Sequence, residues 1–263
     1  MARNVLLAAT ALCGGLLLAP QAGTAQTAID SLGLTVTTTP AITSDYLFRG
    51  LSQTRGRAAA QVTVDAEHSS GFYVGAFVSN VAFAGTNARQ EIDYSAGYRF
   101  ALGDLKLDIG GTYYSYPGFS APRGGFDINF YEFALRTSYE IAPVKFVGLA
   151  AWSPNFSGES GTGVYVEGGF DMALDYGFTI SPRIGYQWVE RNIVPAAGSR
   201  DGYFGAPDYM TLSLAVSREI FGGFIGTGTV VWNSMSQSSG RTECFGGSKV
   251  CDSRALLTLS RPF

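Results

Sequence analysis

The sequence predicts an all-β protein, a transmembrane antiparallel up-and-down β-barrel of about 12 strands that follows a cleaved signal peptide. Three observations predict this fold. Polar and apolar residues alternate along one segment after another, short and long connections take turns between the segments, and aromatic residues gather at segment ends. Together they favour a membrane barrel over a soluble β-sandwich, because a sandwich has no reason to sort its loops by length.

The first 25 residues have the features of a secretory signal. Arg3 precedes an apolar run at residues 5–19, and a small-residue cleavage site ends at Ala25. The run is too short to span a bilayer comfortably, so a membrane anchor is the weaker interpretation. We therefore expect a signal peptide at residues 1–25 and one barrel domain at residues 26–263.

The charge balance of the mature chain is slightly acidic. Without the leader, whose only charged side chain is basic, 17 basic residues stand against 21 acidic ones, a net charge near −4. Nothing in this balance indicates nucleic acid as a partner. After the leader no apolar run is long enough for a transmembrane helix.

The clearest alternation forms a hairpin at residues 91–116. Two runs of period 2 flank a short glycine-containing turn, so each run has one apolar and one polar face. Placing Phe100 opposite Leu105 makes the two apolar faces coincide. The same register sets Arg99 opposite Lys106.

The same pattern recurs along the rest of the chain. In each predicted strand, apolar or aromatic residues occupy every second position, and glycine, proline or serine clusters end the run. The predicted strands lie near residues 32–48, 61–68, 72–81, 91–100, 105–116, 131–136, 146–152, 164–171, 178–188, 210–217, 224–232 and 255–263.

The connections alternate strictly in length. Short ones lie near Ser69, Gly103, Pro143, Gly177 and Gly222. Longer ones begin near Gly50, Gly85, Pro117, Ser153, Arg191 and Asn233. This is the arrangement of an outer-membrane barrel, with tight periplasmic turns and longer external loops.

The aromatic residues agree with this arrangement. Each tryptophan ends a strand that runs into a long loop: Trp152, Trp188 and Trp232. Three phenylalanines directly follow short turns: Phe72, Phe178 and Phe224. We expect them to form two interfacial girdles. The last strand is amphipathic and ends on Phe263, which resembles the signal read by the outer-membrane assembly machinery, although Arg261 departs from it.

The stretch SDYLFRGLSQT at residues 44–54 resembles the N-terminal signature of the TorF-like porin family. Further matching stretches are residues 71–75, 79–81, 91–94 and 113–118. The resemblance implies a Gram-negative outer-membrane barrel with a pore role. It brings no catalytic residues and no substrate.

Charged residues fall on the predicted inward faces of the strands. The pore-lining candidates are Asp65, Asp93, Arg99, Lys106, Asp108, Glu132, Arg136, Glu167 and Arg183. The acids among them near mid-height, opposed mainly by Arg183, form a ring that predicts a preference for cations. The alternative is a lumen plugged by its own salt bridges. A barrel of about eight strands is filled by its own side chains and one of about 16 strands leaves a channel, and about 12 strands lie between these cases.

Two cysteines remain after the leader. Cys244 and Cys251 fit an oxidising compartment and predict one disulfide. A metal site is not expected, because the lone His68 and the cysteines would lie on opposite sides of the membrane. His68 stands beside a short turn, and we interpret it as a surface residue rather than a catalytic base.

Three arginines, Arg49, Arg55 and Arg57, lie at the first long loop. They suit an anionic solute or a lipopolysaccharide phosphate, but a solvated loop is the preferred interpretation. We expect a passive outer-membrane channel for small hydrophilic solutes, in contact with outer-membrane lipids and lipopolysaccharide, with no enzymatic activity and no cofactor. A closed structural or adhesive barrel and a barrel-embedded hydrolase are the alternatives.

Overall fold

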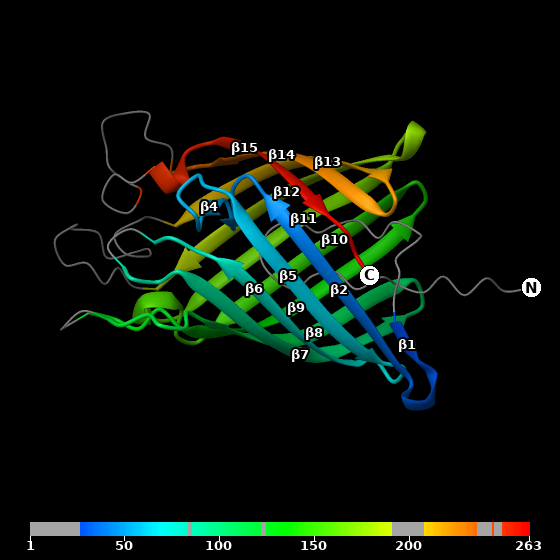
Figure 1. Cartoon of the computed structure of the whole chain (residues 1–263), viewed down its shortest axis with the longest axis horizontal. Helices are drawn as coiled ribbons and strands as arrows, with labels where there is room; N and C mark the ends of the chain where they lie inside the picture. Colours follow the sequence, from blue (N-terminus) through cyan, green and yellow to red (C-terminus); the bar gives the residue numbers. More distant parts are fainter. Residues whose placement is uncertain (1–26, 84–85, 122–124, 191–207, 236–243, 245–248) are drawn as a thin grey trace, which may run out of the picture.

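The computed structural model describes residues 27–83, 86–121, 125–190, 208–235, 244 and 249–263. In this part of the chain, twelve antiparallel strands form a closed barrel (Figure 1). They are β2 (Leu34–Thr43), β5 (Ala59–His68), β6 (Phe72–Asn80), β7 (Gln90–Leu102), β8 (Leu105–Ser115), β9 (Phe130–Ile141), β10 (Val144–Ser153), β11 (Gly163–Ala173), β12 (Phe178–Val189), β13 (Tyr209–Phe221), β14 (Phe224–Asn233) and β15 (Arg254–Ser260). The predicted fold class is confirmed.

The barrel closes at β2, which pairs with β5 on one side and with β15 on the other. On the side of β2 that faces β15, different segments of β2 have different partners. Residues 41–43 pair with β15, and residues 34–36 pair with the short strand β1 (Thr27–Ile29). Between them, the backbone of Thr38 exchanges two hydrogen bonds with Phe263, of 3.0 and 2.8 Å. Both ends of the described chain therefore complete one seam.

The connections sort by length between the two ends of the barrel, as predicted. One end carries the connections at residues 69–71, 103–104, 142–143, 174–177 and 222–223, and we call it the turn end. The other carries the connections at residues 44–58, 81–89, 116–129, 154–162, 190–208 and 234–253, and we call it the loop end, at the left in Figure 1.

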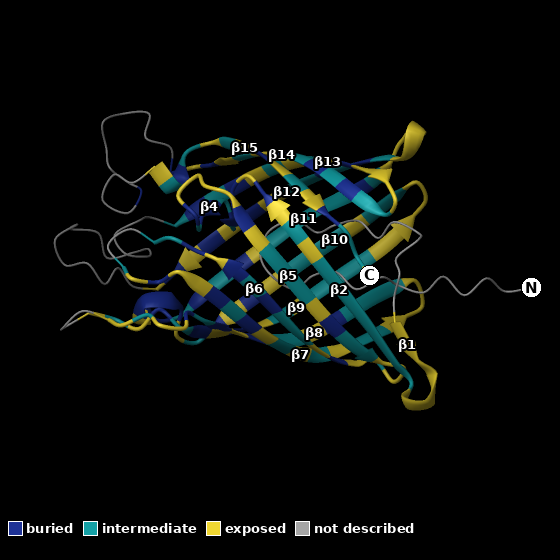
Figure 2. Cartoon of the chain, viewed as in Figure 1, coloured by how far each residue is buried: buried dark blue, intermediate teal, exposed yellow. Residues whose placement is uncertain are grey.

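The sheet has an apolar outer face and a polar inner face. Burial alternates along the strands (Figure 2). Outward side chains such as Ile42, Val74 and Leu257 are more than half exposed, whereas the inward Asp93 and Glu132 are buried. This is the reverse of a water-soluble protein and fits a sheet whose outer face contacts lipid. Among the described residues, no helix has the length and apolar character needed to cross a bilayer.

Aromatic rings lie at both ends of the outer face. At the loop end, Trp152 stacks on Phe133 with ring centroids 5.9 Å apart. At the turn end, Phe72 contacts Tyr98 with centroids 4.8 Å apart. The placement agrees with the two predicted girdles.

The predicted register of the β7–β8 hairpin is wrong by two residues. Phe100 pairs with Leu107 rather than with Leu105, because the turn contains only residues 103 and 104. Gly103 adopts φ 62°, the left-handed conformation that such tight turns require. A shift by two leaves every side chain on its predicted face. It does change partners: Arg99 faces Asp108, and Lys106 faces Ala101.

The first predicted strand, residues 32–48, is too long at its far end. The strand β2 ends at Thr43, and the chain then leaves the wall of the barrel. Residues 47–48 and 51–52 form a separate two-stranded sheet, β3 (Leu47–Phe48) and β4 (Leu51–Ser52), which does not pair with the barrel. This small hairpin defines the candidate site.

Candidate functional site

The β3–β4 hairpin folds into the lumen from the loop end. We call residues 45–54 the inserted hairpin. Its apolar residues Tyr46, Leu47 and Leu51 are buried, as are the polar Asp45 and Thr54. A loop that pointed into solvent would leave such residues exposed, so the hairpin packs inside the barrel.

Arg49 at the tip of the hairpin binds the barrel wall. Its guanidinium donates two hydrogen bonds to the Glu132 carboxylate on β9, of 2.9 and 2.7 Å, and one of 2.8 Å to Gln187 Oε1 on β12. The same group stacks 4.3 Å from the ring centroid of Tyr165 on β11. A bidentate arginine–carboxylate pair is geometrically specific, and stacking on an aromatic face adds to it.

The pair is deeply buried. The Arg49 side chain is 5% exposed and that of Glu132 is 3% exposed. Burial by itself lowers the pKa of Arg49, but the attraction of the Glu132 carboxylate raises it, and the pKa stays above its ordinary value. Arg49 is therefore a permanent cation held inside the lumen, and the expectation that it belongs to a solvated loop is wrong.

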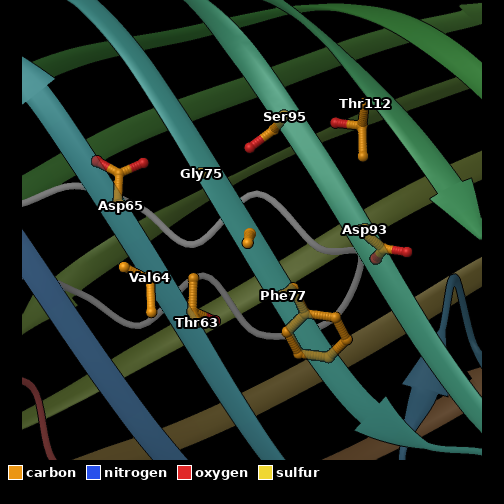
Figure 3. Close-up of a pocket in the computed structure, with 9 residues that line it drawn as sticks. Thr63, Val64, Asp65, Gly75, Phe77, Asp93, Ser95 and Thr112 are labelled. Carbon is orange, nitrogen blue, oxygen red and sulfur yellow. The ribbon is translucent and has the colours of Figure 1, made fainter.

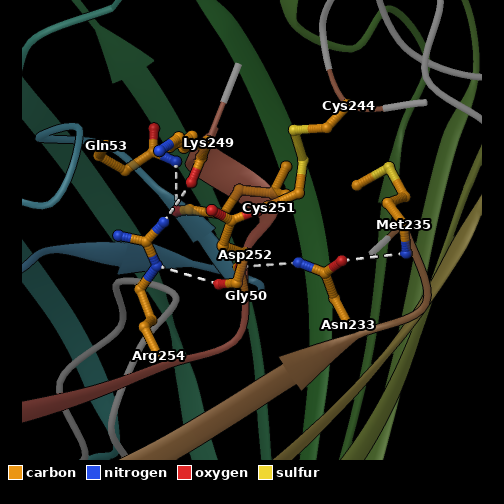
Figure 4. The surroundings of a disulfide bond; sticks show 10 residues. Gly50, Gln53, Asn233, Met235, Cys244, Lys249, Cys251, Asp252 and Arg254 are labelled. Carbon is orange, nitrogen blue, oxygen red and sulfur yellow. Dashed lines mark hydrogen bonds between the residues drawn. A yellow bond between two sulfur atoms is a disulfide. The ribbon is translucent and has the colours of Figure 1, made fainter. Parts of the chain in front are cut away.

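Gly50 beside it permits the close approach. It adopts φ +79°, and a Cβ there would lie 2.7 Å from Thr211 Cγ2 on β13. Its carbonyl oxygen accepts a hydrogen bond of 3.2 Å from Asn233 Nδ2 on β14 (Figure 4). Only glycine meets both the backbone and the steric requirement at this position.

Asp45 holds the base of the hairpin. It accepts hydrogen bonds from Ser52 Oγ at 2.6 Å and Thr54 Oγ1 at 2.7 Å, and it pairs with Arg254 of β15 at 2.6 Å. On the other side, Tyr46 Oη donates to Glu91 Oε1 of β7 at 2.8 Å. The hairpin thus contacts opposite sides of the barrel and crosses its bore.

A disulfide supports the outer side of the hairpin. Cys244 and Cys251 are bonded, with Cα atoms 5.9 Å apart, which confirms the predicted pairing. Both are buried in one apolar cluster with Leu51, Tyr209 and Met235. Figure 4 shows Met235 and the disulfide. The two cysteines therefore pack directly on strand β4.

A second ionic cluster lies nearer the turn end. Arg99 of β7 pairs with Asp65 at 3.0 Å, Glu67 at 2.5 Å and Asp108 at 3.4 Å. It stacks 3.8 Å from the ring centroid of Tyr73, whose hydroxyl donates to Asp108 at 2.8 Å. The Tyr73 ring lies against Gly97, where a Cβ would be 2.6 Å from its hydroxyl. The two clusters share one design: an arginine stacks on a tyrosine whose ring lies against a glycine, Gly97 for Tyr73 and Gly185 for Tyr165.

Between these clusters the wall has a shallow hollow around Gly75 of β6 (Figure 3). Asp65 of β5 and Asp93 of β7 lie on its two sides, and Ser95 and Thr112 complete it. The hollow exists because glycine leaves the wall bare between larger neighbours.

The structure places all the pore-lining candidates on the inward face of the sheet, but it does not join the acids into one open ring. Asp108 is paired with Arg99, and Glu132 is paired with Arg49. Glu167 accepts a hydrogen bond of 2.7 Å from Tyr165 Oη and, among the described residues, has no ion-pair partner. Arg183 pairs with Asp171 instead of with the ring.

Two of the basic pore-lining candidates have no acidic partner among the described residues. Lys106 and Arg136 lie on neighbouring strands, and within the part of the chain described here neither forms an ion pair. Arg136 lies directly opposite Asp108 in the register of β8 and β9, but the Asp108 carboxylate is bound by Arg99. His68 is exposed at the turn end, with Nδ1 2.6 Å from Ser70 Oγ.

Sequence reasoning missed the inserted hairpin. Asp45 lies inside the first predicted strand, residues 32–48, whereas Arg49 and Gly50 lie at the start of a stretch up to Arg57 that is polar on average and resembles a solvated loop. One signal was present: the apolar residues Phe48 and Leu51 flank the Arg49-Gly50 pair, and a loop that stays in water does not need them.

Two solved porins have a similar fold. The porin NanC superposes with a TM-score of 0.54 at 8% identity, over 86% of this chain and 97% of that one. The porin KdgM, solved alone and in complex with disordered oligogalacturonate, superposes with a TM-score of 0.51 at 9% identity, over 87% of this chain and 97% of that one. At this identity the likeness concerns the fold alone.

No curated protein matches the sequence. A family model does match, over residues 27–262, and it therefore covers the whole barrel. The chain belongs to the family described as "bacterial protein of unknown function (Gcw_chp)".

Proposed function

We propose that the protein is an outer-membrane channel for the passive diffusion of small hydrophilic solutes, with its loop end outside the cell. The observation that carries the proposal is a polar lumen whose charges are only partly paired. A barrel sealed for a structural role gains nothing from Lys106, Arg136 and Glu167, which form no ion pair within the described residues. Such groups are stable inside a membrane protein where they face water.

The inserted hairpin sets the width of this channel. It spans the bore near the loop end through Arg49, Gly50 and Asp45. A constriction at one level lets the rest of the lumen stay wide while solutes are selected by size. The function proposed here is therefore a narrow, hairpin-constricted pore.

Single-channel recording in planar bilayers tests the proposal. We expect the refolded protein to conduct in KCl, and Arg49→Ala to conduct more, because it releases the hairpin from Glu132. Lys249→Ala removes an exposed base from the 3-10 helix Lys249–Cys251 at the loop end, serves as the matched control and leaves the conductance unchanged. No current from either the wild type or Arg49→Ala would reject the channel and favour a closed structural or adhesive barrel.

A preference for cations is the finer part of the proposal. It rests on Glu167, since Asp108 and Glu132 are held by arginines, and it requires that Glu167 outweigh the unpaired bases Lys106 and Arg136. An unneutralised carboxylate in a narrow passage attracts cations. Reversal potentials across a KCl gradient test it: Glu167→Gln lowers the preference for K⁺, and anion selectivity of the wild type would refute it.

Other parts of the functional proposal follow from the fold and the sequence. We propose membership of the TorF-like porins on residues 44–54, contact of the outer girdles with lipid and lipopolysaccharide, and insertion by the outer-membrane assembly machinery. We propose no catalytic role. An outer-membrane hydrolytic activity that is lost when His68 is replaced would contradict this. His68 itself lies exposed at the turn end.

A further inference from the structure

The outer face of the barrel is almost free of charge. In the twelve barrel strands the charged side chains lie on the inward faces, and among the described residues the one exception is Arg218 of β13. It shares its outward face with Val216. A second base, Arg261, directly follows β15 and continues the outward row of Leu259. The two arginines thus lie on either side of β14, which pairs with both β13 and β15 (Figure 1).

Both arginines lie at the turn end. Arg218 pairs with Phe178, the first residue of β12. In the turn between β13 and β14, a Cβ on Gly223 would lie 3.6 Å from Nε of Arg261. This is the level of the turn-end girdle, where aromatic rings meet lipid headgroups. In the proposed orientation these headgroups belong to the periplasmic leaflet of the outer membrane.

Each guanidinium stacks on rings of this girdle but has no acidic partner. The Arg218 guanidinium carbon lies 5.0 Å from the ring centroid of Phe178. That of Arg261 lies 4.4 Å from the centroid of Phe263 and 5.2 Å from that of Phe224. Within the described residues neither arginine forms an ion pair. Stacking uses the face of a guanidinium, so the N–H groups in its plane stay available to an anion.

A bare part of the apolar wall lies next to the arginines, further from the turn end. Gly228 of β14 faces outward between Val216 of β13 and Leu257 of β15. A Cβ at Gly228 would have only Leu257 within 4 Å, at 3.6 Å. Leu257 itself is 72% exposed, so this part of the wall is open to the lipid. An acyl chain can therefore lie along β14 while its headgroup stays at the level of the arginines.

We propose that Arg218 and Arg261 bind the phosphate of an anionic phospholipid, such as phosphatidylglycerol, in the periplasmic leaflet. This rests on the proposed outer-membrane location and orientation, but not on conductance. The fork of N–H groups on arginine matches phosphate oxygens, and bases at a membrane surface favour anionic lipids. A zwitterionic headgroup fits less well, because the outward faces of the described strands carry no acid to hold its ammonium group.

Native mass spectrometry of the refolded protein in detergent tests the site by titration with phosphatidylglycerol or phosphatidylcholine. The readout is the ratio of the dissociation constants of the first bound molecule of each lipid. Arg218→Gln and Arg261→Gln, singly and together, remove the charge and keep a long polar side chain. Arg89→Gln is the matched control, because Arg89 is exposed at the loop end and also forms no ion pair among the described residues.

We expect the wild type to prefer phosphatidylglycerol about 25-fold, from about fivefold for each arginine. Each single variant should lower the ratio about fivefold, the double variant should bring it close to one, and the control should keep it.

Three results would overturn the site. One is an equal preference in the wild type and the double variant, or in either single variant should the double variant fail to refold. Another is competition by an equal concentration of inorganic phosphate, which would assign the arginines to a free anion. The third is tighter binding of lipopolysaccharide than of phosphatidylglycerol, which would assign them to the outer leaflet. Absence of KCl current, by contrast, would reject the channel and leave the lipid site standing.

Discussion

Removing Arg49 should release the inserted hairpin while the barrel stays folded. Arg49→Ala deletes both hydrogen bonds to Glu132, the one to Gln187 and the stack on Tyr165. It also leaves the Glu132 carboxylate buried without its cation. The wall does not depend on this pair, because its strands are joined by a closed ladder of backbone hydrogen bonds.

The size of the effect follows from burial. Breaking a buried ion pair by removing one partner costs about 3–5 kcal/mol. With side chains 5% and 3% exposed, the pair needs no discount for solvent screening. Applied to local opening of the hairpin, 3 kcal/mol corresponds to a fall of more than about a hundredfold in protection.

Hydrogen exchange of the refolded protein measures this directly. The Gln53 amide donates to the Tyr46 carbonyl across the hairpin at 2.7 Å and reports its opening. Amides of β7 and β8 report the wall and should not change. Protection at Gln53 that stays at the wild-type level would refute the idea that Arg49 holds the hairpin in place. Equal loss of protection in the wall would show that Arg49 stabilises the whole barrel instead.

A double variant separates the pair from its surroundings. Glu132→Gln alone leaves Arg49 buried beside an amide, whereas Arg49→Ala with Glu132→Gln leaves no unpaired charge. The double variant should therefore lose less protection than the sum of the single ones, by about 1–3 kcal/mol. Additive losses would mean that the two residues act on the hairpin independently.

Three further results are expected. Gly50→Ala should raise the conductance, because its Cβ meets Thr211, whereas Gly118→Ala, also at φ +79° but with no atom within 4 Å, should not; equal effects would assign the change to backbone strain alone. Replacing both bonded cysteines by serine should loosen the outer side of the hairpin by about 2–3 kcal/mol without lowering the melting temperature of the barrel, which circular dichroism can follow. A cysteine at Asn87 should react with impermeant reagents on intact cells and one at Ser70 only after the outer membrane is breached, and the opposite pattern would invert the orientation.

The wall of the barrel was predictable because its rule is local. Alternation fixes the face of each side chain within one strand, so even the wrong pairing of Phe100 with Leu105 kept every residue on its face. The predicted partner of a residue on the neighbouring strand is less reliable than its predicted face. The same slip turned the ion pair of Arg99 with Asp108 into a predicted repulsion between Arg99 and Lys106, because turn length sets the register and the sequence left it open by two residues.

The site was not predictable by these means. Arg49 meets Glu132, 83 positions along the chain, and Gln187, 138 positions along. No periodicity links residues so far apart, and a loop has no alternation to show its direction. Alternation correctly placed acids and bases on the inward faces, but it could not show that the inserted hairpin pairs Arg49 with Glu132.

The seam between β2 and β15 has a consequence for the order of folding. Nearly every strand pairs with its neighbour in sequence, so the wall assembles through short chain separations. The seam joins Thr43 to Thr258 across 215 positions, and Pro40 has no N–H to offer there. Contacts of such separation carry the largest entropic barrier and form last. The partners of Arg49 come into reach only as the ring closes, so the hairpin must dock after the wall is complete, and a chain halted before its final strand keeps an unblocked entrance.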